Sequence, residues 1–571
     1  MRHKLIALMI VCMAALGLSV APAWAQSSGQ AQTVKQGALT VQGADADANA
    51  TQNAVNANVP VVISGVGVSA GSSSANQNAG NAANASAQNT SLTLQAAQAT
   101  QTGGGSSCYA GCGGGGQYQA VGQAAGTVQS ADADADAKQN AVNANVPVTI
   151  AGGDVKAGSS SATQDADNEA DADAKNGSLT IQAVEATQTG GGSSCKKGCG
   201  GSGQYQAVGQ LAVTHQDAKA DADADQNAVN GNAPVAIAGG DVETGDSKAE
   251  QDAKNEADAD AKNGSLTIQA VEATQTGGSS CKSKCYSPCK YGCGGDGQAQ
   301  EIGQVALTVQ DAKAEADADQ NAVNGNAPVA IAGGDVETGS SSADQNAENE
   351  ANAGAWNESA TVQLVSAEQS GGGSWCAKGC GGSGQYQAVG QIAATLQAAE
   401  ADADAKQNAV NGNAPVAIAG DDVKTGSSSA TQNAENEANA GAENASLTLQ
   451  GAKVKQSGGA CKTRCGSLCE KGCSSPCKKG CFEYGDRCTW GCGGASQTQK
   501  VGQLAGTKQK ADAVADAKQN AVNGNAPVAI AGDDVYTGSS SADQNAENEA
   551  NGWAANKSLT IQAALAWQSL R

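Results

Sequence analysis

The chain has 571 residues and a formal net charge of −23, and only 3% of its residues are aromatic. An acidic chain without clustered Lys and Arg cannot neutralise phosphates well, so we expect no nucleic-acid partner. Its apolar content comes mainly from Ala, which excludes a thick globular core and leaves either thin packed layers or disorder. The strict patterning described below favours thin layers.

The N-terminus has the pattern of an export signal. Basic residues at positions 2–4 precede the apolar run Leu5–Val20, and Ala23-Trp24-Ala25 is a small-x-small cleavage site. The run is shorter than the ~20 residues that span a bilayer, and nothing later resembles a membrane span. We therefore predict a signal peptide at residues 1–25 and a secreted or cell-surface protein that begins near Gln26.

A repeat governs the rest of the chain. The sequence Gln-Asn-Ala-Val-Asn occurs six times, at intervals of 87, 87, 94, 87 and 112 residues, with first residues Gln52, Gln139, Gln226, Gln320, Gln407 and Gln519. Such regularity predicts an array of similar units. The predicted units are residues 26–121, 122–208, 209–302, 303–389, 390–501 and 502–571, and each of the first five ends in a loop that contains cysteine.

The first half of a unit alternates small and charged residues. In the second unit, Ala and Asp alternate over Ala131–Ala137, and the β-branched stretch Val146–Ile150 follows. As a strand, the alternating run places Ala on one face and Asp on the other. Helix is the alternative, because Ala is a good helix former, but a helix would scatter Asp around its surface. Pro147 cannot donate a hydrogen bond, which places it at a strand start, an edge or a bulge.

The second half of the unit repeats this pattern. Residues 164–175 resemble the first alternating run, and Asn176-Gly177 separates them from the apolar stretch Ser178–Val184. Asn-Gly between alternating runs predicts a hairpin, so we expect about four strands per unit. The predicted fold is an elongated all-β repeat array, either a β-solenoid or a series of β-hairpins, with contacts mostly between neighbouring units.

Cysteine is the sharpest local signal. All cysteines except Cys12 lie in five loops, each with an even number and almost all with C-x-x-x-C spacing. They are Cys108, Cys112, Cys195, Cys199, Cys281, Cys285, Cys289, Cys293, Cys376, Cys380, Cys461, Cys465, Cys469, Cys473, Cys477, Cys481, Cys488 and Cys492. Even numbers in an exported protein favour disulfides within each loop. Thiolate binding of a soft metal such as zinc and bridges between chains remain alternatives.

Other candidate sites are weaker. His215 is the one histidine left after export, and the other units have no counterpart, so the chain lacks the usual general base and we expect no enzyme, no catalytic residue and no cofactor. Runs such as Asp221-Asp223-Asp225 offer oxygen ligands for calcium, although neither an EF-hand loop nor a GGxGxD repeat is present. The alternative is a solvated face whose charges prevent aggregation.

Two short patterns resemble secreted bacterial assembly proteins. Gln-Asn-Ala placed along alternating strands resembles curli subunits, and Asn145–Ile150 (Asn-Val-Pro-Val-Thr-Ile) resembles a stretch of chaplins. The resemblance implies an extracellular structural protein and assigns no residue a role. We therefore expect a structural protein of an envelope, spore coat, filament or matrix, whose partners are further copies or cell-wall polymers. The alternative is an adhesin or a metal or calcium binder that displays loops on a rod.

Overall fold

The computed structural model describes residues 30–103, 107–108, 116–191, 194–195, 203–278, 297–371, 384–458 and 496–570. These residues form strands joined by short turns. No helix long and apolar enough to cross a membrane occurs within these ranges.

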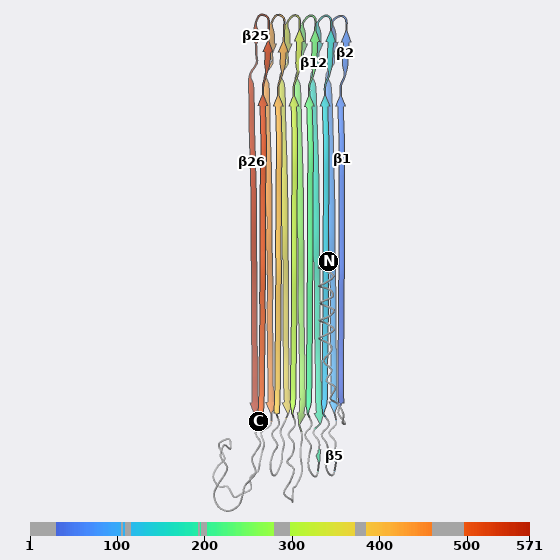
Figure 1. Ribbon diagram of the computed structural model, residues 1–571, viewed down its shortest axis with the longest axis vertical. Helices are drawn as coiled ribbons and strands as arrows, with labels where there is room; N and C mark the ends of the chain where they lie inside the picture. The colour runs from blue at the N-terminus through green and yellow to red at the C-terminus, as the bar shows by residue number, and fades with distance from the viewer. Residues whose placement is uncertain are drawn as a thin grey trace, which may run out of the picture.

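Each unit is one long U of chain (Figure 1). In unit 2, β6 (Gln117–Asn145) runs to the tip, β7 (Val148–Ala151) and β8 (Val155–Ala157) turn the corner, and β9 (Ser160–Gly191) runs back. At about 3.3 Å per residue, the 29 residues of β6 span roughly 95 Å. The protein is therefore longest along its strands.

The other units repeat this plan. Unit 1 contains β1 (Gln30–Asn58), β2 (Val61–Ser64), β3 (Val68–Ala70) and β4 (Ser73–Gly103); unit 3 contains β11 (Gln204–Asn232), β12 (Val235–Ala238), β13 (Val242–Thr244) and β14 (Ser247–Gly278); unit 4 contains β15 (Gln298–Asn326), β16 (Val329–Ala332), β17 (Val336–Thr338) and β18 (Ser341–Gly371). Unit 5 contains β19 (Gly384–Asn413), β20 (Val416–Ile418), β21 (Val423–Thr425) and β22 (Ser428–Gly458); unit 6 contains β23 (Ser496–Asn525), β24 (Val528–Ile530), β25 (Val535–Tyr536) and β26 (Ser540–Leu570). Between units, β5 (Ser107–Cys108) pairs with β10 (Ser194–Cys195).

The units stack side by side as a β-solenoid. The first long strands form one six-stranded sheet, here called the ascending sheet, in the order β1-β6-β11-β15-β19-β23, and the second long strands form the descending sheet, in the order β4-β9-β14-β18-β22-β26. Two further six-stranded sheets close the tip. Every strand pairing in the described residues is parallel, for example β6 with β11 and β9 with β14. The expected all-β array is therefore confirmed, and of its two forms the solenoid is present.

One local expectation was wrong. Asn176-Gly177 forms no hairpin but lies in the middle of β9, because its register partners Asn89-Thr90 and Asn263-Gly264 hold it extended from both sides. The boundary between the first two predicted units, at residue 122, falls inside β6, where Lys35 and Gly209 pair with Gly122. Units here begin at the long strand, at Gln117 in unit 2.

The alternating runs face as predicted. Ala220, Ala222 and Ala224 of β11 are fully buried, and they pack with Ala170 and Ala172 of β9 in one continuous alanine cluster. Asp221, Asp223 and Asp225 point to the opposite face of the same strand, which is the outer face of the slab. Because Ala ends at Cβ, the two sheets approach closely, and this thin layer replaces a thick core.

Buried amide side chains tie both sheets together. The Gln226 amide nitrogen donates to Gln139 Oε1 of the previous unit at 2.9 Å, to the Ala166 carbonyl of β9 at 2.6 Å and to the Lys254 carbonyl of β14 at 2.9 Å. Its own oxygen accepts from Gln320 Nε2 of the next unit at 2.8 Å. Each such glutamine thus links neighbouring strands within one sheet and also bridges to the facing sheet.

The tip is held by a second polar network and by close backbone stacking. Asn232 Nδ2 donates to Ser247 Oγ at 2.9 Å, and Ser160 Oγ donates to Asn232 Oδ1 at 2.7 Å. Pro147 lies at the corner between β6 and β7, where its carbonyl accepts from the Val235 nitrogen. A Cβ on Gly239 would lie 2.6 Å from the Gly152 oxygen, so the turn requires glycine there.

The facing of β11 gives a first prediction. Ala222→Asp buries an unpaired carboxylate in the alanine cluster, and we expect it to lower the free energy of unfolding by ~3 kcal/mol or more. Asp225→Ser on the outer face of the same strand should change it by less than ~1 kcal/mol. Urea unfolding followed by far-UV circular dichroism measures both, and equal effects would contradict the facing.

The amide network gives a second prediction. Gln226→Leu keeps the side chain's bulk but leaves the buried Gln139 oxygen without its donor and removes the bridges to the Ala166 and Lys254 carbonyls, so we expect a loss of ~2–4 kcal/mol. Asn227→Leu, one residue on and on the outer face, is the matched control and should cost below ~1 kcal/mol. The idea fails if thermal melting ranks the two variants the other way round.

Candidate functional surfaces

In-register stacking converts single acidic residues into columns on both outer faces. On the ascending sheet one column of five carboxylates is formed by Asp136, Asp223, Asp317, Asp404 and Asp516. On the descending sheet it is formed by Glu169, Glu256, Glu350, Glu437 and Glu549. Adjacent members are about 4.8 Å apart along the stack, where two like charges repel by ~1 kcal/mol even in water.

Lysines in the neighbouring columns offset part of this repulsion. Lys138 Nζ lies 3.6 Å from Asp225 of the next unit, and Lys406 Nζ lies 3.4 Å from Asp319 of the previous one. Near the tip, Lys156 of β8 pairs with Glu243 of β13 at 2.8 Å. Such pairs are exposed, so their main effect is to keep like charges apart between units.

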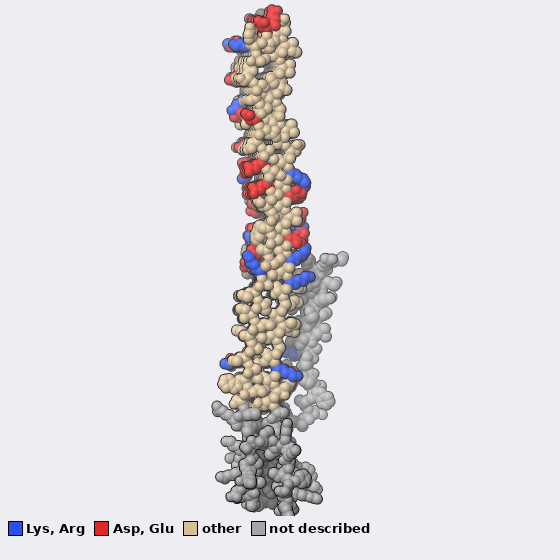
Figure 2. Space-filling model, turned by 90° about the vertical axis from the view of Figure 1, so that its left-hand side faces the viewer, with Lys and Arg blue, Asp and Glu red and all other residues tan. Residues whose placement is uncertain are grey.

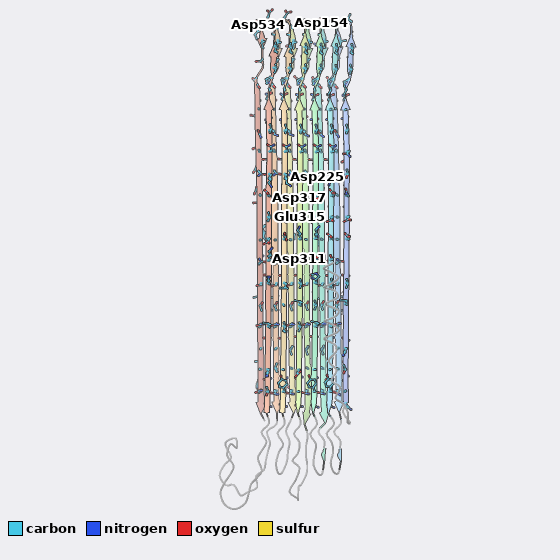
Figure 3. The ribbon with its side chains drawn as sticks, viewed as in Figure 1. Asp154, Asp225, Asp311, Glu315, Asp317 and Asp534 are labelled. Atoms are coloured by element: carbon cyan, nitrogen blue, oxygen red, sulfur yellow. The ribbon has the colours of Figure 1, made fainter. Side chains whose placement is uncertain are left out.

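The pKa values of two carboxyl groups respond strongly to this crowding. Burial in the column raises the pKa of Asp317 to about 6, and the neighbouring Asp223 adds to the shift. Burial likewise raises the pKa of Asp258 on β14 to about 6, against the opposing hydrogen bond that it accepts from Asn352 at 2.8 Å. Figure 3 labels Glu315 and Asp317 on β15, in the half of the strand nearer the tip.

The fold does not bring the carboxylates of the expected calcium site together around one point. Asp221, Asp223 and Asp225 are two residues apart on one strand, which separates their Cα atoms by almost 7 Å. Among the described residues, no group of three or more His, Cys, Asp or Glu side chains could hold a metal ion. Calcium binding remains a prediction.

The cysteine loops share one end of the slab. β4, β9, β14, β18 and β22 all end at glycine there, at Gly103, Gly191, Gly278, Gly371 and Gly458, and the next ascending strand starts from the same end (Figure 1). In the first two loops the backbone pairs Cys195 with Cys108. The other candidate disulfide cysteines lie outside the described residues, so the pairing of all eighteen, and the soft-metal alternative, remain predictions.

His215 lies on the outer face of β11, in the column between Val128 and Val309. Its side chain therefore points to the outer side of the slab. The column supplies it with no second histidine.

A cavity runs through the tip of the solenoid. It has a volume of about 720 Å³ and is lined in every unit by the corner proline and by small residues of the turn, from Pro60 and Ser73 in unit 1 to Pro527 and Ser540 in unit 6. The lining is mostly Pro, Ala, Val, Gly and Ser. No sequence pattern predicts this cavity, because it exists only where the corners of six units stack.

The two ends of the stack are open sheet edges. Among the described residues, β1 and β4 have neighbouring strands on one side only, as do β23 and β26. Large apolar side chains are exposed there, including Leu92 at 60% in unit 1 and Leu559 at 55% and Trp567 at 64% in unit 6. Figure 2 looks onto the unit 6 edge, where charged side chains flank an uncharged interior.

Comparison of the chain with protein-family models, with curated proteins and with solved structures found no match. The function must therefore be argued from the geometry above.

The sequence reasoning assigned no role to the buried amides. The signal for them was present, because Gln139, Asn143 and Asn145 share the parity of the buried alanines Ala131–Ala137 and recur in every unit. Gln and Asn residues that occupy the same alternate positions as the buried alanines must also face inward. Once the strands are known to be parallel and in register, such residues predict hydrogen-bonded amide ladders between strands.

The crowded carboxyls predict a pH dependence of stability. An acid whose pKa is raised in the folded state binds its proton more tightly there, so stability rises as pH falls from about 7 towards 4. We expect a higher melting temperature at pH 5 than at pH 7.5.

Asp317→Asn should raise stability at pH 7.5 by about 1 kcal/mol, after allowance for solvent screening, and should weaken the pH dependence. Asn321→Ser, an outward change on β15 that removes no titrating group, is the control. A melting temperature that falls steadily from pH 7.5 to pH 5 would contradict the assignment.

Proposed function

We propose that this chain is an exported structural protein of a bacterial cell surface or extracellular matrix. The observation that carries the proposal is the common origin of the five cysteine-containing loops at one end of a regular slab. Neighbouring strands lie about 4.8 Å apart, so the slab holds these loops in a closely spaced row. An array that multiplies one surface suits a structural element better than a single reaction centre.

The slab itself suits load-bearing use. Its six units share continuous hydrogen-bonded sheets, and each interface between units is reinforced by buried amide columns such as the one through Gln226 and Gln320. The charged outer faces keep the slab in solution and discourage face-to-face aggregation. Its partners are then further copies or cell-wall polymers.

A binding function is the second candidate. It is favoured by the contrast between the acidic outer faces and the lysines in the loops, such as Lys196, Lys197, Lys282 and Lys284. A row of basic loops could hold an anionic wall polymer. The two functions differ in what happens when the loops are removed.

The location of the protein tests the export that both candidate functions require. In the source cells, we expect the protein in the extracellular or surface fraction, with an N-terminus near Gln26, as measured by fractionation and N-terminal sequencing. Intact Met1 on a cytoplasmic protein would overturn the proposal for both candidates.

Loop replacement separates structure from binding. Small disulfide rings constrain the unfolded chain only slightly, and β14 and β15 keep their register whatever the loop length. Replacing residues from Cys281 to Cys293 with Gly and Ser should therefore leave the β signal and the melting temperature nearly unchanged.

For a structural protein, this replacement should weaken the association between molecules in the surface layer, and gel electrophoresis without reductant shows whether bridges between chains contribute to it. For an adhesin, it should instead reduce retention on purified cell wall. Replacing Asn551 and neighbouring outward residues of β26 with Ser is a control that leaves every loop intact. Collapse of the β signal on loop replacement would contradict the separation of loops and slab.

A further inference from the structure

We propose that copies of this chain stack end to end, with unit 6 of one copy on unit 1 of the next, and extend the two long sheets into a ribbon. The inference deepens the proposed structural function, on which its biological meaning rests. The contact would repeat the interface that already joins unit 2 to unit 3, and unit 5 to unit 6, within one chain.

The two edges are complementary in their backbone groups. Inward-facing residues point their N–H and C=O groups to the following unit, as when Gln117 N donates to the Gly203 oxygen at 2.9 Å and Asn58 O accepts from Val146 N at 2.8 Å. Outward-facing residues point to the preceding unit. Unit 6 therefore has its inward-facing set unpaired in the described residues, and unit 1 its outward-facing set, which are the two halves of one parallel ladder.

The register does not depend on the covalent connection. Amide columns join residues that are 87, 94 or 112 positions apart with the same geometry, as at Gln226 to Gln139, Gln320 to Gln226 and Gln519 to Gln407, with distances of 2.9, 2.8 and 2.7 Å. Side-chain identity therefore sets the register, while loop length varies. The junction between two copies has no covalent link, but it contains the same side chains and can therefore adopt the same register.

Both end units keep every buried amide column. Unit 1 presents Gln30, Gln32, Gln36, Gln42, Gln52, Asn56, Asn58, Gln77, Asn81, Asn89, Gln95 and Gln101, and unit 6 presents Gln497, Gln499, Gln503, Gln509, Gln519, Asn523, Asn525, Gln544, Asn548, Asn556, Gln562 and Gln568 in the same register. A terminal unit that served to cap the stack would break these columns. Here they continue to both edges.

The charges of the two ends also fit. In unit 1 only Lys35, Asp45 and Asp47 are charged within β1 and β4, and β4 carries no charge at all. Stacking places all four lysines of β23 opposite uncharged residues: Lys500 opposite Thr33, Lys508 opposite Val41, Lys510 opposite Gly43 and Lys518 opposite Thr51. Asp512 opposite Asp45 is the one like-charged pair that stacking would create between the described strands, and Lys510 already pairs with Asp512.

Apolar side chains complete the match. In the same register, Leu559 stacks on Leu92 and Ile561 on Leu94, and all four are exposed at the ends of the isolated chain. Trp553 lies over Gly441 within its own chain and would face the small Ser86 of the next copy. Burying such residues on both sides adds hydrophobic stabilisation to the ladder.

This contact joins two different surfaces and leaves a free edge at each end, so it grows without closing. The units in Figure 1 stand side by side with parallel axes, and such a stack gives a ribbon in place of a ring. All cysteine loops would line one margin of this ribbon. The tip cavity would continue through each junction along the other margin.

The test uses the full mature chain and charge variants of the β1 edge. Val41→Lys, Gly43→Lys and Thr51→Lys together place lysine opposite Lys508, Lys510 and Lys518 of the next copy. Val41→Glu, Gly43→Glu and Thr51→Glu place carboxylates there instead and are the matched control. All three positions face outward on an edge strand, so both variants should keep the wild-type β signal as dilute monomers.

We expect wild type to form ribbons that grow along the stack, seen by negative-stain electron microscopy and quantified by sedimentation. The lysine variant should need at least a tenfold higher concentration to assemble, and the glutamate variant no more than wild type. The difference should shrink at high salt. Adding Lys508→Glu, Lys510→Glu and Lys518→Glu to the lysine variant should restore assembly.

Three outcomes would overturn the stacking. They are a wild-type chain that stays monomeric in the micromolar to millimolar range, equal impairment by both variants, and ribbons whose long axis runs along the strands. A surface-located protein that remains monomeric would end this inference and leave the proposed function standing. Ribbon formation by a chain that is never exported would support the stacking and overturn the proposed function.

Discussion

The structure depends on one constraint, the parallel in-register stacking of identical residues. Gln139, Gln226 and Gln320 meet only because their strands align residue for residue, and each amide then satisfies the next. A slip of one residue would turn every buried alanine and amide to solvent and bring aspartates inside. The repeat is thus precise for a physical reason, and large aromatic side chains are not needed to hold the sheets together.

The same stacking that stabilises the interior creates the electrostatic cost outside. Asp136, Asp223 and Asp317 stand in one column because their strands are in register, and burial together with the neighbouring Asp223 raises the pKa of Asp317. Lysines in adjacent columns relieve part of it. Unit 1 carries far fewer charges than the inner units, which lowers the repulsion at the end where a further copy would dock.

Open sheet edges are usually a liability that proteins block with charge, proline or bulges. Here the β1 and β23 edges are long, regular and free of proline, and the interior pattern runs unchanged to both of them. In a protein meant to remain single this would be poor protection against aggregation. In a structural protein these edges allow further copies to add, which explains why the buried amide columns continue into both terminal units.

The sequence by itself determined the repeat, the β-rich class and the facing of Ala131–Ala137, because the 87-residue interval and the period-two alternation are local patterns that report burial directly. It could not decide between a solenoid and serial hairpins, and Asn176-Gly177 indicated the wrong one. Turn propensity is a local preference, whereas the two neighbouring strands on either side of β9 hold that dipeptide extended. Only the tertiary structure decided that equivalent residues of different units become neighbours. The amide columns, the carboxylate columns and the two complementary edges all follow from this stacking, because none of them exists within a single unit.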